Sequence, residues 1–151
     1  MNPSSNIPRR PLRTILSMAL LFLAAAGLHA EPLAITLSGA AEVPPVVTSA
    51  SASGEITVLP NRNISGSIKV TGMVPTKAHI HEAAVGKNGP PIITLTFSPD
   101  NTFAVPADSR LSEAQFNSFT MGNLYVNVHS AQYPDGEIRA QIPGKPMRLA
   151  Q

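Results

Sequence analysis

Three histidines are the residues of this chain whose spacing could do chemistry: His79, His81 and, much further along, His129. If residues 78–81 form a β-strand, both imidazoles of the H-x-H pair leave the same face, because side chains alternate along a strand. Their Cβ atoms then lie about 6 to 7 Å apart. Two rings at that spacing can converge on one metal ion, since histidine nitrogens bind zinc at about 2.0 to 2.1 Å.

The segment 124–129 carries a matching polar row. Its leucine and two valines share one face of the expected strand, whereas Tyr125, Asn127 and His129 share the other. If this row lies beside His79 and His81, the three imidazoles form an all-histidine ligand set, which suits copper or zinc and does not suit calcium or magnesium. The affinity order of the divalent metals favours copper over zinc. The alternative is that all three are ordinary hydrogen-bonded strand residues, and the pattern leaves both interpretations open.

Four further polar residues are candidates for a supporting role. Glu137 and Arg139 are two residues apart on the last expected strand and share a face. The simplest interpretation is a solvated ion pair across neighbouring strands, which would add little stability. Alternatively these two residues, together with Tyr125 and Asn127, orient the histidines or guide an anion towards them. No motif for a hydrolase, a metalloprotease or a nucleotide-binding protein is present, so no catalytic residue is assigned.

The elements that must position these residues are short strands separated by glycine, proline, asparagine and serine. This pattern is typical of an all-β fold and predicts an antiparallel Greek-key β-sandwich or barrel. One short connecting helix is expected to begin after Ser112, which forms a capping box with Gln115, and to end at Gly122. The expected strands are 33–38, 52–59, 63–71, 77–82, 91–97, 123–130 and 136–142.

The first thirty residues predict a signal peptide, because three arginines precede an apolar run that ends in Leu28-His29-Ala30. The mature chain is then expected to start at Glu31, with the domain over 31–143 and a tail over 144–151. Three of the 11 basic residues and none of the 9 acidic residues lie in the leader, which leaves eight basic against nine acidic residues. A nearly neutral domain does not indicate a nucleic-acid partner, and no membrane association is expected once the leader is removed.

The chain contains no cysteine. Disulfides and thiolate metal sites are therefore excluded, and the stability of an exported domain must come from its core. The predicted location is the periplasm or the extracellular space.

Several motifs, in order along the chain, resemble the CHRD domain, a family that takes its name from a secreted developmental protein and occurs alone in many bacterial exported proteins. The matching segments are 37–45, 78–81, 88–90, 122–130 and 136–141. The resemblance implies a small extracellular or periplasmic β-sandwich, usually without an assigned activity.

A second resemblance concerns the segment from Gly66 to Glu82, which is similar to the first copper-ligand strand of copper/zinc superoxide dismutase. It implies a superoxide dismutase-like sandwich, with an immunoglobulin-like one as the other possibility. It also implies roles for His129 as a further copper ligand and for Arg139 as the anion-guiding residue. The histidine that bridges copper and zinc, the zinc ligands and the cysteine pair of that family have no counterpart here.

Three functional hypotheses follow. The first is an exported domain that holds a copper ion, or a zinc ion, through His79, His81 and His129 as a carrier, buffer or redox site. The second is a structural module without metal, whose partner is a protein of the cell envelope or extracellular space. The third, a dismutase-like enzyme, ranks last.

Overall fold

The computed structural model describes residues 30–144. Residues 1–29 of the predicted leader and the predicted tail beyond Gly144 lie outside the described residues. Within the described range, no helix is long and apolar enough to cross a membrane. A short 3-10 helix, η1 (Gly39–Ala41), and one α-helix, α1 (Glu113–Thr120), accompany nine strands. The strands are β1 (Leu33–Ser38), β2 (Ser51–Val58), β3 (Ile64–Thr71), β4 (Pro75–Glu82), β5 (Pro91–Thr94), β6 (Thr96–Ser98), β7 (Thr102–Ala104), β8 (Leu124–Ser130) and β9 (Ile138–Gln141).

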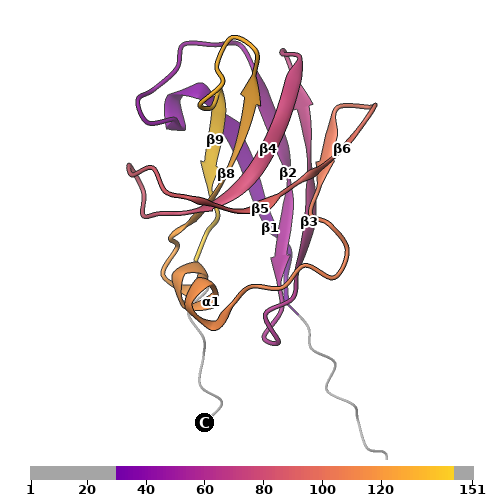
Figure 1. Ribbon diagram of the computed structural model, residues 1–151, viewed down its shortest axis with the longest axis vertical. Helices are drawn as coiled ribbons and strands as arrows, with labels where there is room; N and C mark the ends of the chain where they lie inside the picture. The colour runs from indigo at the N-terminus through magenta and orange to yellow at the C-terminus, as the bar shows by residue number, and fades with distance from the viewer. Residues whose placement is uncertain (1–29, 145–151) are drawn as a thin grey trace, which may run out of the picture.

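All nine strands pair antiparallel in the order β5-β4-β8-β9-β1-β2-β3-β7-β6, which curls into a nearly closed barrel (Figure 1). One half of the sheet contains β5, β4, β8 and β9, and the other contains the remaining five strands. The halves meet through a single residue pair, Ser38 with Arg139. At the other side the chain itself joins them, because β5 continues into β6 across the buried residue Leu95.

The predicted all-β antiparallel fold with one short helix is confirmed. Two details of the expected strands were wrong. The segment 91–97 is two strands rather than one, because it bends at Leu95 to pair first with β4 and then with β7. Strand β7 was not expected, since it has only three residues and follows a turn in which Asn101 has a positive φ of 63°.

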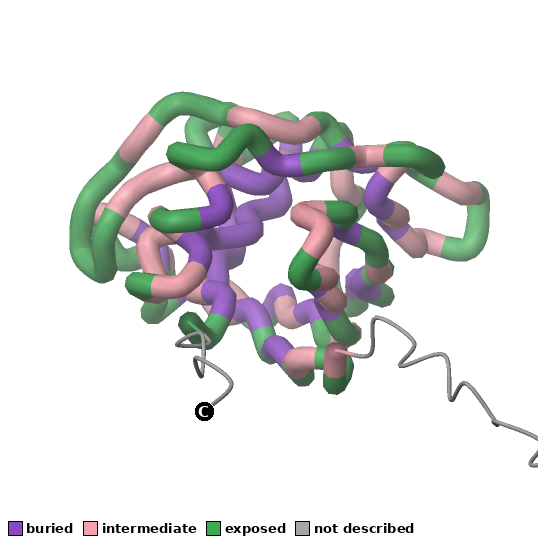
Figure 2. Tube along the Cα trace, turned by 90° about the horizontal axis from the view of Figure 1, so that it is seen from below, coloured by how far each residue is buried: buried purple, intermediate pink, exposed green. Residues whose placement is uncertain are grey.

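A single hydrophobic core fills the barrel, and buried segments line its interior while exposed segments face outwards (Figure 2). Strand β3 shows how the sequence builds this arrangement: Ile64, Ile68 and Val70 are buried, whereas the polar residues between them are exposed. This alternation follows from the two-residue period of a strand with one wet face.

Helix α1 covers one end of the barrel (Figure 1). Ser112 and Gln115 form the predicted capping box, and Phe116 and Phe119 are buried in the core. At the other terminus Gly122 has a φ of 75° and donates its N–H to Phe119. The predicted helix and both of its ends are therefore confirmed, since a left-handed glycine after the last turn stops a helix.

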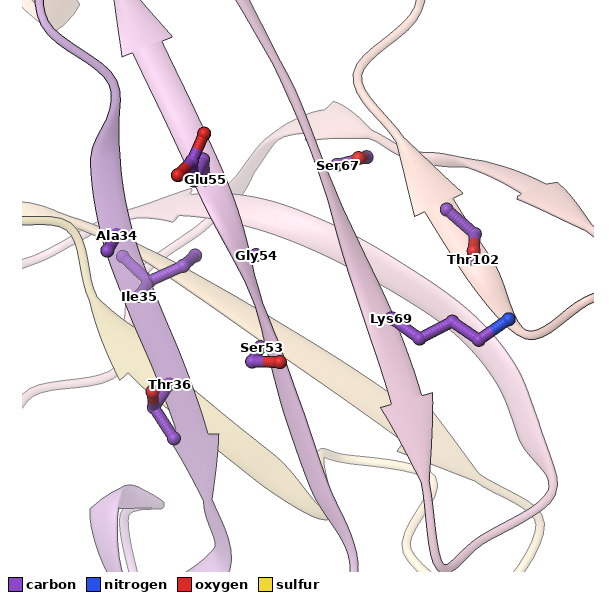
Figure 3. A pocket seen from close by; sticks show the side chains of 9 residues that line it. All are labelled: Ala34, Ile35, Thr36, Ser53, Gly54, Glu55, Ser67, Lys69 and Thr102. Carbon is purple, nitrogen blue, oxygen red and sulfur yellow. The ribbon is translucent and has the colours of Figure 1, made fainter.

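The two halves of the barrel differ in what lies over their outer faces. Over β1, β2, β3 and β7 the outer face is open, and Figure 3 shows a shallow groove there among short side chains such as Ser53 and Ser67. Over β4, β8 and β9, loops 83–90 and 131–137 contact outward-facing side chains. Loop 39–50 adds to the cover, since Thr48 bonds to Glu137 of loop 131–137. As a result all seven residues of β8 are buried, the outward polar row included.

Candidate metal centre

The three histidines meet on the covered outer face of the β4–β8 pair. Strand β4 lies antiparallel to β8, with His79 opposite Asn127, His81 opposite Tyr125 and Lys77 opposite His129. The inward positions of both strands, such as Ile80 and Val126, are completely buried in the core. The predicted juxtaposition of the two polar rows is thus what the fold produces, because neighbouring strands in register place equivalent faces together.

The imidazole rings are close enough to share one ion. One ligand nitrogen from each histidine lies within 4.8 Å of the others. Nδ1 of His79 and Nε2 of His129 are 3.0 Å apart, and the rings of His79 and His81 have their centroids 5.5 Å apart. Around a tetrahedral ion with bonds of about 2.05 Å, neighbouring nitrogens would be about 3.3 Å apart. The cluster therefore fits a metal ion after ring movements of up to about an ångström and a half.

Backbone carbonyls fix which nitrogen of two histidines is free. Nδ1 of His81 lies 2.9 Å from the carbonyl oxygen of Gly89, and Nδ1 of His129 lies 2.9 Å from that of Pro134. Because a carbonyl only accepts, each Nδ1 carries the proton, and each Nε2 presents a lone pair. A hydrogen bond of this kind orients a metal-binding histidine and raises its basicity as a ligand.

All three histidines have lowered pKa values, with burial as the largest cause. For His79 the pKa falls to about 4, since the charges of His129, His81 and Lys77 add to the effect of burial. The imidazoles are neutral at physiological pH, which is the form that binds a metal.

His81 carries the strongest sign that a ligand belongs here. Its Nε2 is buried and has no hydrogen-bond partner in the part of the chain that the structure describes. Such an orphaned lone pair costs about 1 to 3 kcal/mol unless something occupies the space in front of it. His79 is only half-buried, so the cluster is reached from solvent on its side.

Tyr125 and Arg139 lie against the cluster as a stacked pair. The ring of Tyr125 stacks on His81 with centroids 4.8 Å apart, and the Arg139 guanidinium lies 3.4 Å from the centre of the same tyrosine ring. Arg139 also donates to the carbonyl of Lys87 and the side chain of Asn88, both in loop 83–90. Arg139 is only 2% exposed. Its side chain thus holds this loop over the histidines, while the anion-guiding role stays a prediction.

Glu137 does not pair with Arg139. Its carboxylate accepts a hydrogen bond of 2.6 Å from the hydroxyl of Thr48 and is buried. Among residues 30–144 the one salt bridge is Lys69–Asp100, on the open side of the barrel. The interpretation of Glu137 and Arg139 as a solvated ion pair was therefore wrong, because loops cover the face on which both lie.

Glu42 is a buried residue near the site that the sequence pattern did not single out. It follows η1 and is 6% exposed, and burial raises the pKa of its carboxyl, although Arg139 and Asn127 oppose that shift. Its Oε1 and the Oδ1 of Asn127 are buried without hydrogen-bond partners in the described range. No periodicity marks a loop residue of this kind, and an acidic residue amid apolar ones in Ala41-Glu42-Val43 was the only signal.

Fold and site together define a class: a small antiparallel β-barrel in which three neutral histidines lie under loops on one outer face. A model of the CHRD domain family matches residues 33–142, which is most of the chain. The protein belongs to the CHRD domain family. Neither a curated protein nor a solved structure matched the chain.

Family membership confirms the resemblance on which the sequence analysis relied and supports an extracellular or cell-envelope setting. The likeness to superoxide dismutase stays a prediction.

Proposed function

We propose that this CHRD domain binds one copper ion through His79, His81 and His129 and acts as a carrier, buffer or redox site outside the cytoplasm. The observation that carries the proposal is the orphaned, buried Nε2 of His81, which belongs to one of three neutral imidazoles whose ligand nitrogens lie within 4.8 Å of one another. A hydrogen-bond network alone would leave that atom without a partner.

The donor set supports copper in preference to zinc. Imidazole suits both metals, and neither thiolate nor carboxylate belongs to the three-residue cluster. With the same ligands, copper(II) binds more tightly than zinc(II) in the ordinary affinity order. Copper bound here would supply one-electron redox chemistry, whereas the surrounding loops would limit contact with water.

The half-exposed position of His79 favours exchange of the ion over permanent burial. In the metal-free arrangement its Nδ1 donates to Nε2 of His129, whose own proton is on Nδ1. For Nδ1 of His79 to bind an ion, its proton must move to Nε2 of the same ring. This step breaks one hydrogen bond and needs no large movement of the strands, as expected for a carrier or buffer.

The rival hypothesis is an interaction module without metal. It is favoured by loop 39–50, in which Val47 is 98% exposed beside Pro44 and Pro45. An exposed apolar side chain of this kind is suited to an envelope or extracellular protein partner. Under this hypothesis the histidines only fill space below the loops.

Elemental analysis for copper and zinc, combined with a copper(II) titration, tests the proposal. The wild-type chain should bind one equivalent, and a variant with His79, His81 and His129 all changed to alanine should bind none. A control variant with Thr36, Ser53 and Ser67 changed to alanine alters three residues on the open face and should bind as wild type does. Binding by the wild type that does not exceed that of the triple-histidine variant would eliminate the metal site and leave the interaction module.

A further inference from the structure

Asn127 lies at the centre of the outward-facing side chains that surround the proposed ion. It is opposite His79 across the β4–β8 pair and shares a strand face with His129, two residues away. Its side chain also contacts the ring of His81. Only 3% of the residue is exposed. Asn127 thus lies next to all three histidines on the covered face.

The surroundings of the Asn127 amide determine which of its ends faces the histidines. Its Nδ2 lies 3.5 Å from the carbonyl oxygen of Asp135. Glu42 is on the same side, because its Oε1 and the Asn127 Nδ2 both lie against Gly136. A Cβ added to this glycine would be 2.7 Å from Oε1 of Glu42 and 2.8 Å from Nδ2 of Asn127. Both neighbours of the NH₂ group are oxygen acceptors. The carbonyl oxygen, Oδ1, is therefore turned towards His81.

Two acceptors, Nε2 of His81 and Oδ1 of Asn127, belong to neighbouring side chains on the covered face. Nε2 of His81 presents a lone pair, because its Nδ1 carries the proton that bonds to Gly89. Oδ1 of Asn127 is a carbonyl oxygen and cannot donate. Both atoms are buried and without partners in the part of the chain that the structure describes. Two neighbouring buried acceptors without partners call for something electropositive near both, either a cation or the O–H of a water molecule.

We propose that Oδ1 of Asn127 is a fourth donor to the ion held by the three histidines, and that the Asp135 carbonyl positions it by accepting from the NH₂ end. This inference rests on the proposed function and names the donor that sets the preference of the site. An amide oxygen is a harder donor than imidazole, so it favours copper(II) over copper(I).

Two substitutions separate a donor from a structural residue. Asn127→Leu keeps the approximate shape and removes the oxygen, so copper(II) affinity should fall by about tenfold or more while copper(I) affinity stays within about threefold. A tenfold loss for copper(II) alone corresponds to a rise of about 59 mV in the midpoint potential. Asn127→Asp keeps an oxygen facing His81, so its copper(II) affinity should equal or exceed that of the wild type.

The measurements are competition titrations of the full chain with copper(II) and copper(I), together with the electron paramagnetic resonance spectrum of the copper(II) form. The spectrum should change in both variants, because the donor atom is lost in one and charged in the other. Asn117→Asp, an exposed position on α1, is the matched control and should change nothing. Circular dichroism establishes that each variant is folded before metal is added.

The outcomes also separate this inference from the proposed function. If the wild type binds copper and both variants match it in affinity and spectrum, an ordered water occupies the space and the inference is overturned. Equal losses of copper(II) affinity in both variants would also overturn it, since they would indicate a structural role only. If Asn127→Leu does not fold, Asn127→Asp is sufficient as a test. An Asn127→Asp variant with the copper(II) affinity and the spectrum of the wild type then overturns the inference. No copper binding by the wild type would remove the proposed function itself.

Discussion

The two outer faces of the barrel have the same strand geometry and opposite chemistry. On the open face, polar side chains of β2 and β3 such as Glu55 and Ser67 are exposed and satisfied by solvent (Figure 3). On the covered face, Asn127 and Arg139 are almost fully buried and depend on partners from the loops. A buried polar group without a partner costs about 1 to 3 kcal/mol, whereas an exposed one costs nothing. Covering a face therefore turns each polar side chain on it into a structural requirement or a ligand site.

The covered face is also where the unsatisfied atoms of the described range lie. Glu42, His81 and Asn127 each leave one buried polar atom without a partner, and all three belong to that face or its loops. Buried polar side chains that lack partners are expected at a functional site. The free-energy cost of leaving them unpaired is offset only when a ligand is present.

The largest expected difference between the two faces comes from replacing one cationic side chain on each of them. Arg139→Met should lower the free energy of unfolding by about 2 to 4 kcal/mol, because it breaks hydrogen bonds of a buried guanidinium to Lys87 and Asn88. Lys69→Met, the matched change on the open face, should alter it by less than about 0.5 kcal/mol. Urea unfolding of both variants measures the difference. Equal effects would mean that the loops do not stabilise the covered face.

A smaller effect is expected from removing one hydroxyl on each face. Thr48→Val leaves the buried carboxylate of Glu137 without its donor and should cost about 1 to 3 kcal/mol. Thr71→Val removes an exposed hydrogen bond of 3.0 Å to Ser51 and should cost less than about 0.5 kcal/mol. The comparison is a pair of thermal melts. A Thr71→Val loss as large as that of Thr48→Val would show that exposure does not distinguish the two faces.

The third expected effect is a dependence of stability on pH that comes from the histidines. The pKa of His79 is about 4 in the folded chain against 6.5 ordinarily, so between these values the unfolded state binds more protons. The contribution of His79 to the free energy of unfolding is fully present above pH 6.5 and is lost as the pH falls towards 4. Glu42 has a raised pKa and contributes with the opposite sign above its ordinary value of 4.5. The difference in the free energy of unfolding between the wild type and the triple-histidine variant isolates the part of the pH dependence that comes from the histidines.

That difference is measured without metal, by denaturant titration at several pH values. It should shrink as the pH is lowered from 6.5. A constant difference across this interval would show that the histidines are not buried in neutral form.

Much of the site could be predicted from the sequence because alternation along a strand is a local property. The parity of His79, His81 and His129 placed all three on outward faces, and the pairing of β4 with β8 then brought them together. The same reasoning could not predict that the outward row would be buried. Alternation of apolar and polar residues in β8 is what a half-wet strand also shows, as in β3.

The missing information lies in the loops, which have no periodicity. Glu42, the carbonyl of Gly89 and the carbonyl of Pro134 reach the site from three different loops. Every residue has a backbone carbonyl, so the residue type does not indicate which carbonyl will reach the site. The position of the Gly89 carbonyl depends on the path of loop 83–90, which Arg139 holds in place through Lys87 and Asn88, and those contacts join residues about fifty positions apart.

The bend at Leu95 has a consequence for how this protein behaves in a crowded compartment. A long unpaired sheet edge is a template on which a second chain can add its own strand and start aggregation. Here one continuous run supplies both edges, and each is short: four residues in β5, which begins at a proline, and three in β6. A domain without cysteine has no disulfide to prevent its sheet from opening. Its protection against self-association is instead built into the path of a single segment.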